Sequence, residues 1–282
     1  MTARPDLVYG AVLAAALLHA GWNALIKRSA DTLLSTTGIA AASAAIALAA
    51  LPWLPAPAAA SWPFILSSLV LQIVYMRLLA RIYRVADMSA SYPVMRGTAP
   101  LLVAAASAAL FHEALNPTAL AGIAAICGGI LCIGRRSTGI PAAPSGLRLA
   151  LLNAAVIASY TLVDGAGVRQ SGAPASYTLW IFLLQGCAMT LMGLRARPGA
   201  LPSYLRAHWR SCLAGGFGSV MSYGVALWAM TLAPIAIIAA LRETSILFGT
   251  LIAGLCLRER LGPARILGAC ILVLGAALLR LA

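Results

Sequence analysis

The sequence predicts an all-α integral membrane protein with ten transmembrane helices, arranged as two inverted five-helix repeats around a central cavity. Three observations predict this fold class. The 282 residues are 62% hydrophobic and only 10% charged, whereas a soluble domain carries about 25% charged residues. The apolar residues form ten segments of a length that crosses a bilayer. The second half of the chain also repeats motifs of the first half in the same order.

Each predicted span contains about 20 mostly apolar residues, the number that crosses the hydrocarbon core as a helix. The ten spans cover residues 7–26, 33–54, 62–82, 88–111, 117–134, 147–167, 174–194, 209–232, 235–257 and 263–281. Asn116-Pro117 and Gly262-Pro263 are typical helix starts, because each has an N-cap residue followed by proline. The first span leads directly into the next and is expected to be a retained helix rather than a signal peptide.

Two stretches, residues 89–134 and 235–280, align without a gap. Identical residues then stand opposite one another: Arg96 and Arg242, Glu113 and Glu259, Pro117 and Pro263, Gly122 and Gly268, Gly129 and Gly275. Residues 1–134 therefore form the first predicted repeat, 135–146 a connecting loop, and 147–282 the second repeat. Because five spans is an odd number, the second repeat enters the membrane from the opposite side, an architecture that many secondary transporters use.

The positive charges indicate an orientation in the membrane. Of the 20 Lys and Arg residues, three lie in or near the spans (Arg77, Arg96 and Arg242), and three lie on one face (Arg4, Arg169 and Arg280). The other face collects the remaining 14: Lys27, Arg28, Arg81, Arg84, Arg135, Arg136, Arg148, Arg195, Arg197, Arg206, Arg210, Arg258, Arg260 and Arg265. Since loops rich in Lys and Arg stay in the cytoplasm, this count places both termini outside. The positive charges in the loops therefore account for the net charge of +13. We expect no nucleic-acid binding, because no stripe of basic residues that could bind nucleic acid lies outside the spans.

Arg96 and Arg242 are the charges that most need an explanation. Both lie inside apolar spans, at matching positions of the two repeats, where an arginine costs about 2.5–3.5 kcal/mol on insertion scales. They are expected either to line a polar cavity or to fix helix packing. Tyr92 lies one turn from Arg96 on the same helix face, and Pro93 and Pro100 are expected to kink this helix and free two backbone carbonyls.

Two acidic residues also lie within predicted spans. Tyr160 and Asp164 are four residues apart and share a helix face, whereas Glu243 follows Arg242 and points about 100° away from it. Either acid could receive a substrate ammonium group, carry a coupling proton, neutralise an arginine or form a structural ion pair.

Aromatic residues complete the candidate cavity, because Trp22, Tyr75 and Tyr223 lie deeper than the interfacial aromatics. The candidate substrate-binding residues are Trp22, Tyr75, Tyr92, Arg96, Tyr160, Asp164, Tyr223, Arg242 and Glu243. Glu113 and Glu259 precede helix starts and are interpreted as structural groups near the loops. The repeated glycines are seven residues apart in each copy and predict small-residue seams for close helix contact.

The sequence contains no constellation typical of an enzyme. Its seven acidic residues and three histidines form no metal motif. The six cysteines lie within or at the edge of apolar segments with no pattern of a zinc site or disulfide framework. No Ser-His-Asp set and no glycine-rich phosphate loop are found. We therefore expect neither enzyme activity nor a metal ion or cofactor.

Three runs and two tails carry a family resemblance. They are LHAGWNALIK at residues 18–27, YPVMRG at 92–97, RETS at 242–245, and the two tails in which a glutamate precedes paired glycines. In these motifs the chain resembles the EamA-type, ten-helix branch of the drug/metabolite transporter (DMT) superfamily. The resemblance implies a cavity lined by the first, third, fourth, sixth, eighth and ninth helices, with the fifth and tenth outside it. Relatives commonly have both termini in the cytoplasm, the reverse of the orientation that the charge count gives.

The resemblance further implies a secondary transporter of the bacterial inner membrane, since relatives export amino acids, including aromatic ones, and other small metabolites. Arg96 and Arg242 are expected to attract a carboxylate, and Asp164 or Glu243 an ammonium group or a proton. The expected function is export of a small molecule such as an amino acid by alternating access, with membrane lipid as surroundings and a coupling proton as a further partner. The alternatives are an uptake carrier, an exporter of lipophilic drugs and, in another class, a membrane enzyme or a non-transporting membrane subunit.

Overall fold

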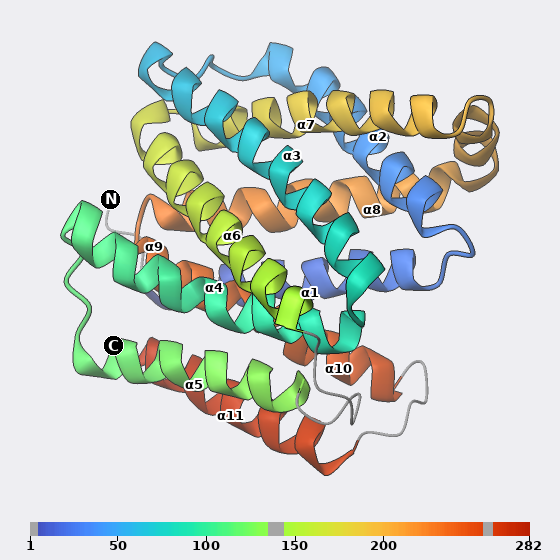
Figure 1. Ribbon diagram of the computed structural model, residues 1–282. Coiled ribbons are helices and arrows are strands. Elements are labelled where there is room, and N and C mark those ends of the chain that lie inside the picture. The colour runs from blue at the N-terminus through green and yellow to red at the C-terminus, as the bar shows by residue number, and fades with distance from the viewer. Residues whose placement is uncertain (1–4, 135–143, 256–261) are drawn as a thin grey trace.

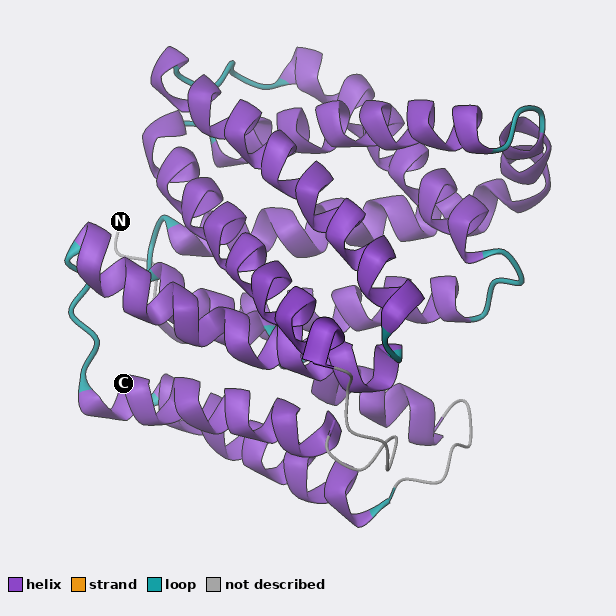
Figure 2. Cartoon of the chain, viewed as in Figure 1, coloured by secondary structure: helices purple, strands orange, loops and turns teal. Residues whose placement is uncertain are grey.

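The computed structural model describes residues 5–134, 144–255 and 262–282, and every regular element in these ranges is helical (Figure 2). The helices are α1 (Pro5–Lys27), α2 (Thr32–Ala50), α3 (Trp62–Val85), α4 (Met88–Phe111), α5 (Pro117–Gly134), α6 (Pro144–Ser171), α7 (Pro174–Ala196), α8 (Ala200–Met230), α9 (Ile235–Arg242), α10 (Ser245–Leu255) and α11 (Pro263–Arg280). Two short 3-10 helices, Leu51–Trp53 and Ala59–Ser61, connect α2 to α3. Most of the predicted loop 135–146 falls outside the described residues, as do Arg258, Glu259 and Arg260.

The described helices confirm the predicted all-α membrane fold. Ten helical segments are long and apolar enough to cross a bilayer when α9 and α10 are counted as one span. Predicted and observed boundaries agree closely except at α8, which begins at Ala200 rather than at residue 209. The added turns meet the rest of α8 at a kink, where His208 has non-helical backbone angles (φ −121°, ψ 22°). The fourth span is one helix that runs through Pro93 and Pro100.

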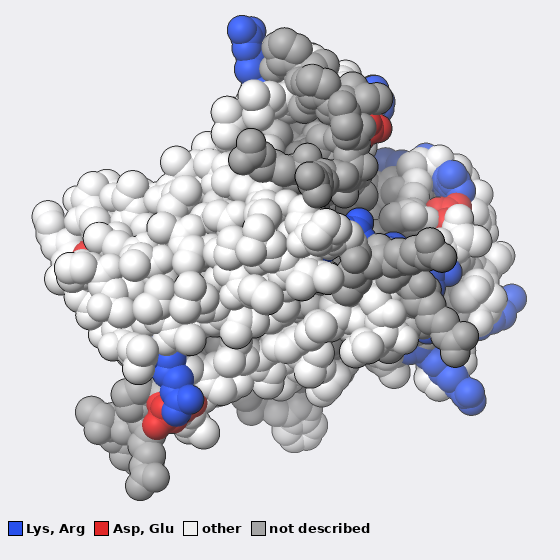
Figure 3. All heavy atoms as spheres, turned by 90° about the horizontal axis from the view of Figure 1, so that it is seen from below, with Lys and Arg blue, Asp and Glu red and all other residues white. Residues whose placement is uncertain are grey.

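Neighbouring spans alternate in direction, so that the beginning of α1 and the end of α11 lie at the same end of the bundle (Figure 1). Consequently α1 and α6, which begin the two halves, run in opposite directions, as an inverted repeat requires. Viewed from below, a wide uncharged surface separates Lys and Arg atoms gathered toward one end from fewer charges at the other (Figure 3). Such a band is what a hydrocarbon core requires of the surface that it surrounds.

The two halves are also joined at the end opposite the termini. Asp31 caps α2 by accepting a hydrogen bond from the N–H of Leu34 at 3.0 Å, and its carboxylate pairs with Arg197 at the end of α7. The Leu34 hydrogen bond, followed by the Arg197 guanidinium, lowers the pKa of the Asp31 carboxyl. A capping carboxylate thus also ties α2 to α7 outside the spans.

The predicted glycine seams form the contact between α5 and α11. A Cβ built on Gly129 would lie 2.7 Å from the carbonyl oxygen of Gly268, and one on Gly275 would lie 2.8 Å from that of Gly122. Only glycine permits backbones to approach this closely. The sequence alignment of residues 89–134 with 235–280 pairs Gly129 with Gly275 and Gly122 with Gly268, so it exchanges these two contacts.

Replacing one of these glycines should separate the two helices. Gly129→Ala is expected to lower the free energy of unfolding by about 1–3 kcal/mol, because the new methyl group meets backbone that cannot rotate away. Gly128→Ala is the matched control, since a Cβ there has no described atom within 4 Å. Thermal unfolding of the two purified variants in detergent measures the difference. Equal stability of the two variants would contradict the close contact.

Candidate functional site

Four charged side chains meet in the interior of the bundle. Arg96 comes from α4, Asp164 from α6, and Arg242 and Glu243 from the end of α9. Asp164 is fully buried, and Arg96 and Glu243 are 9% and 5% exposed. Arg96, Arg242, Glu243 and Tyr160 line a cavity of about 10 Å³ between these helices, which is space for about one water molecule. Four of the nine residues predicted from the sequence therefore meet at one small cavity.

Arg96 is neutralised within the protein. Its Nη2 atom lies 2.9 Å from Oε1 of Glu243, and both side chains are buried. Of the roles considered for Glu243, the structure thus shows the neutralisation of an arginine. Two polar atoms of the pair, Nε of Arg96 and Oε2 of Glu243, have no hydrogen-bond partner among the described residues. Buried polar atoms without partners are uncommon in folded proteins and mark positions where water or a ligand can bind.

Asp164 is held by hydroxyl groups rather than by a cation. The Tyr223 hydroxyl donates a short hydrogen bond to Oδ2, and the Tyr177 hydroxyl donates to Oδ1 at 3.4 Å. Ser68 of α3 contributes a further side-chain hydrogen bond. A carboxylate has about four lone-pair sites, so Asp164 keeps acceptor capacity for another donor.

Arg242 stacks on an aromatic ring and has no acidic partner within ion-pair distance in the described part of the chain. Its Cζ atom lies 4.7 Å from the centroid of the Tyr223 ring, the geometry of a cation–π contact. The hydroxyl of the same ring donates to Asp164. Tyr223 therefore places a guanidinium on its face and a carboxylate at its edge.

The ninth span, predicted as residues 235–257, is found at Ile235–Leu255 and contains a break that the sequence did not predict. α9 ends at Arg242 and α10 begins at Ser245. At the break the backbone N–H groups of Glu243 and Thr244 donate to carbonyls three residues earlier, instead of four as in an α-helix. The Thr244 hydroxyl also donates to the Leu241 carbonyl, at 2.6 Å. Such a tight turn interrupts the α-helical hydrogen bonds. Interrupted membrane helices are common at the binding sites of secondary transporters.

Aromatic side chains surround the charged residues. The rings of Tyr75 and Tyr160 meet edge to face, with centroids 6.0 Å apart. Both rings and that of Tyr92 are close enough to Arg96 to interact with its charge. On α1, the Trp22 ring meets the His19 ring edge to face at 5.1 Å, and its buried indole N–H has no hydrogen-bond partner among the described residues.

Sequence reasoning did not place Tyr177 or Ser68 in the site. Neither residue shares a helix with one of the four charged site residues, and only the folded helices bring their hydroxyls to Asp164. One signal was present in Gly167, where a Cβ would overlap the Tyr177 hydroxyl. A glycine one turn from a buried carboxylate leaves the space that this hydroxyl occupies.

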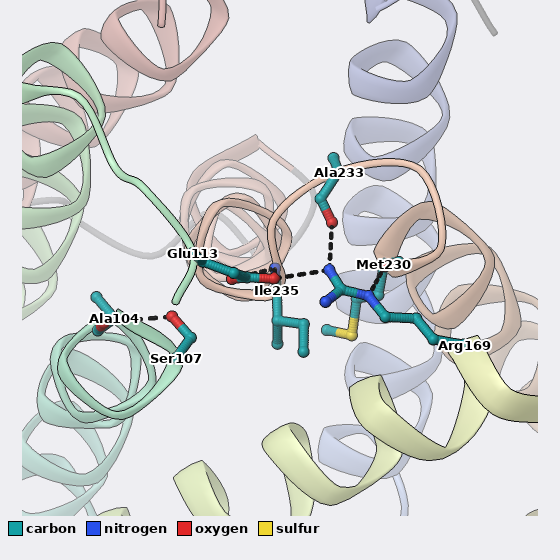
Figure 4. A network of polar contacts seen from close by, with 7 residues as sticks. All are labelled: Ala104, Ser107, Glu113, Arg169, Met230, Ala233 and Ile235. Carbon is teal, nitrogen blue, oxygen red and sulfur yellow. Dashed lines mark hydrogen bonds and ion pairs between the residues drawn. The ribbon is translucent and has the colours of Figure 1, made fainter. Parts of the chain in front are cut away.

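A second polar network (Figure 4) is built around Glu113 in the loop between α4 and α5, which lies at the end of the bundle that carries both termini (Figure 1). Glu113 accepts a hydrogen bond from Nη2 of Arg169 at 2.7 Å, and its two oxygens lie 3.1 and 3.0 Å from the backbone nitrogen of Ile235. Arg169 also donates to the carbonyls of Met230 and Ala233, at 2.8 and 3.0 Å. Glu113 thus caps α9 from the loop after α4, in line with its interpretation as a group near a loop.

Comparison with known proteins identifies the type of chain that carries this site. The profile of the EamA-like transporter family matches residues 144–281, which contain Asp164, Tyr223, Arg242 and Glu243. The match and the ten apolar helices together agree with a transporter of the DMT type.

A likeness in fold covers nearly the whole chain. Among solved structures, 27 chains match. One is a crystal structure described simply as that of a protein, with a TM-score of 0.74 and 18% sequence identity over 97% of this chain and 95% of the other. At that identity the likeness concerns the fold alone. None of the curated proteins compared matches the chain.

Proposed function

We propose that this chain is a secondary transporter that exports amino acids or similar small zwitterions across the bacterial inner membrane by alternating access. The observation that carries the proposal is the arrangement around Tyr223, with Arg242 on the ring face and Asp164 at the hydroxyl. An α-amino acid carries a carboxylate and an ammonium group on one carbon atom. Its carboxylate would bind Arg242 and its ammonium group Asp164.

The charges of the site support a zwitterionic substrate. Arg96 and Glu243 neutralise each other, which leaves one cation, Arg242, and one anion, Asp164, for a ligand. A zwitterion would occupy both charges without adding net charge to a site of low dielectric constant. The partnerless atoms of Trp22, Arg96 and Glu243 offer further polar contacts.

The surrounding rings support an apolar or aromatic substrate side chain. Tyr75, Tyr92 and Tyr160 supply ring faces and edges beside Arg96, and aromatic pairs add about 0.5–1.5 kcal/mol beyond their buried area. The cavity of about 10 Å³ does not hold an amino acid. The described conformation is therefore interpreted as a closed state, and alternating access requires the helices to separate when substrate enters.

Exchange of labelled amino acids by the purified protein in lipid vesicles tests the proposal. Arg242→Gln is expected to reduce exchange about 10- to 100-fold, because a hydrogen bond to a charged group contributes about 1.5–3 kcal/mol. Arg242→Lys, which retains the positive charge, should lose less. Flux of lipophilic drugs that is unaffected by Arg242→Gln would favour the drug exporter instead. The direction of the imposed gradient that drives net flux distinguishes an exporter from an uptake carrier. If the protein carries neither amino acids nor drugs, the membrane enzyme and the non-transporting subunit are the alternatives that remain.

A further inference from the structure

We propose that Glu113 and Arg169 form a latch that closes one end of the transport path and opens in every cycle. The inference rests on the proposed transport function, and concerns the network at the end of the bundle with both termini. The latch consists of these two side chains and the backbone groups of Met230, Ala233 and Ile235 that they bind (Figure 4).

The latch joins the four elements that carry the charged residues and Tyr223. Glu113 follows α4, the helix of Arg96, and Arg169 lies near the end of α6, the helix of Asp164. The carbonyl of Met230 ends α8, the helix of Tyr223, and the N–H of Ile235 begins α9. A substrate that leaves the site toward this end must pass between elements that the latch holds together.

α9 connects the latch directly to the site. Its eight residues span about 12 Å at 1.5 Å per residue, and Ile235 to Leu241 are all buried. The first residue is capped by Glu113 and the last is Arg242. The Ile235 side chain also packs on Gly165, next to Asp164, where an added Cβ would lie 2.6 Å from its Cδ1 atom. A movement of α9 at the latch therefore shifts both charges that the substrate is proposed to bind.

The contacts of the latch are of a kind that can break and re-form. Glu113 is largely buried, with a side chain 9% exposed, whereas the Arg169 side chain is 33% exposed. Water can therefore reach the guanidinium and replace the protein acceptors when the helices separate. The carboxylate gains further stabilisation from the helix N-terminus of α9, so the closed state is favoured when no substrate drives opening. A contact made of apolar side chains could not exchange its partners for water in this way.

Accessibility of a cysteine in the site measures the opening of the latch without any knowledge of the substrate. In a variant without the six native cysteines, Ala239→Cys places a thiol in the lining of the central cavity. Glu113→Gln and Arg169→Gln are each expected to raise its rate of reaction with a membrane-impermeant maleimide about tenfold from the latch end. Asp6→Asn is the matched control, because it breaks an exposed ion pair with Arg280 at the same end, and should leave the rate unchanged.

A reversible cross-link distinguishes a moving latch from a permanent structural tie. Cysteines at positions 113 and 169, joined by a short reducible bifunctional reagent, should stop amino-acid exchange, and reduction should restore it. If the glutamine variants react at the rate of the parent and the cross-linked protein exchanges substrate normally, the latch is wrong. Labelling that responds as expected while no amino acid is exchanged would instead support the latch and refute the proposed substrate.

Discussion

Asp164→Asn is expected to stop amino-acid exchange while leaving the helices folded. Asparagine has nearly the same shape and can still accept a hydrogen bond from the Tyr223 hydroxyl. It carries no charge, however, and so cannot balance a substrate ammonium group in a position with no solvent exposure. Removing one partner of a buried charge pair costs about 2–5 kcal/mol. Exchange should therefore fall about 30-fold or more.

Initial rates of exchange in vesicles, together with thermal unfolding of the same preparation, measure both parts of this prediction. Tyr177→Phe is the matched control, since it removes the longer, 3.4 Å hydrogen bond to the same carboxyl and no charge. We expect it to change exchange by less than about threefold. Exchange by Asp164→Asn at the rate of the unmodified protein would show that the ammonium group binds elsewhere.

Most of the fold was predictable because the bilayer restricts what the sequence can form. A chain in hydrocarbon must satisfy its backbone hydrogen bonds internally, so long apolar segments become helices. Their predicted limits agree with those observed except at the start of α8. The contact of α5 with α11 was marked by glycines, since close approach of two helices needs small residues at regular spacing. Both predictions depend on properties that a single segment displays in its own sequence.

The partners of the buried charges were not predictable in the same way. Glu243 stands next to Arg242 in the sequence but pairs with Arg96 of another helix. Likewise, Arg169 is 56 residues from Glu113, and Tyr177 belongs to α7, which carries none of the four charged site residues. The break after Arg242 was missed because the polar run at residues 242–245 is short and apolar residues resume at Ile246, which gives one segment long enough to cross a bilayer. Pairings between helices and the ends of half-helices depend on tertiary packing, which the pattern of one segment does not contain.

The ion pair of Arg96 with Glu243 changes what is expected of Arg96→Ala. From the sequence alone, this substitution is expected to remove flux and leave folding intact. In the structure it leaves Glu243 buried, 5% exposed, and without its cation. Breaking one partner of a buried ion pair costs about 3–5 kcal/mol, which is a large share of the stability of a folded domain. Arg96→Ala should therefore lower the unfolding temperature as well as the flux.

A double-mutant cycle separates the two effects. Arg96→Met and Glu243→Leu alone should each destabilise the protein, because each leaves the other member of the pair buried and unpaired. The combination Arg96→Met with Glu243→Leu removes both charges and should recover most of the unfolding temperature, since apolar replacement of a whole buried pair is often neutral. The combination should recover little of the flux if the partnerless Nε and Oε2 atoms of the pair contact the substrate. Additive losses of stability in the double variant would instead mean that Arg96 and Glu243 act independently. The two residues would then not neutralise each other, and the argument that Arg242 and Asp164 are the charges that bind a zwitterion would fail.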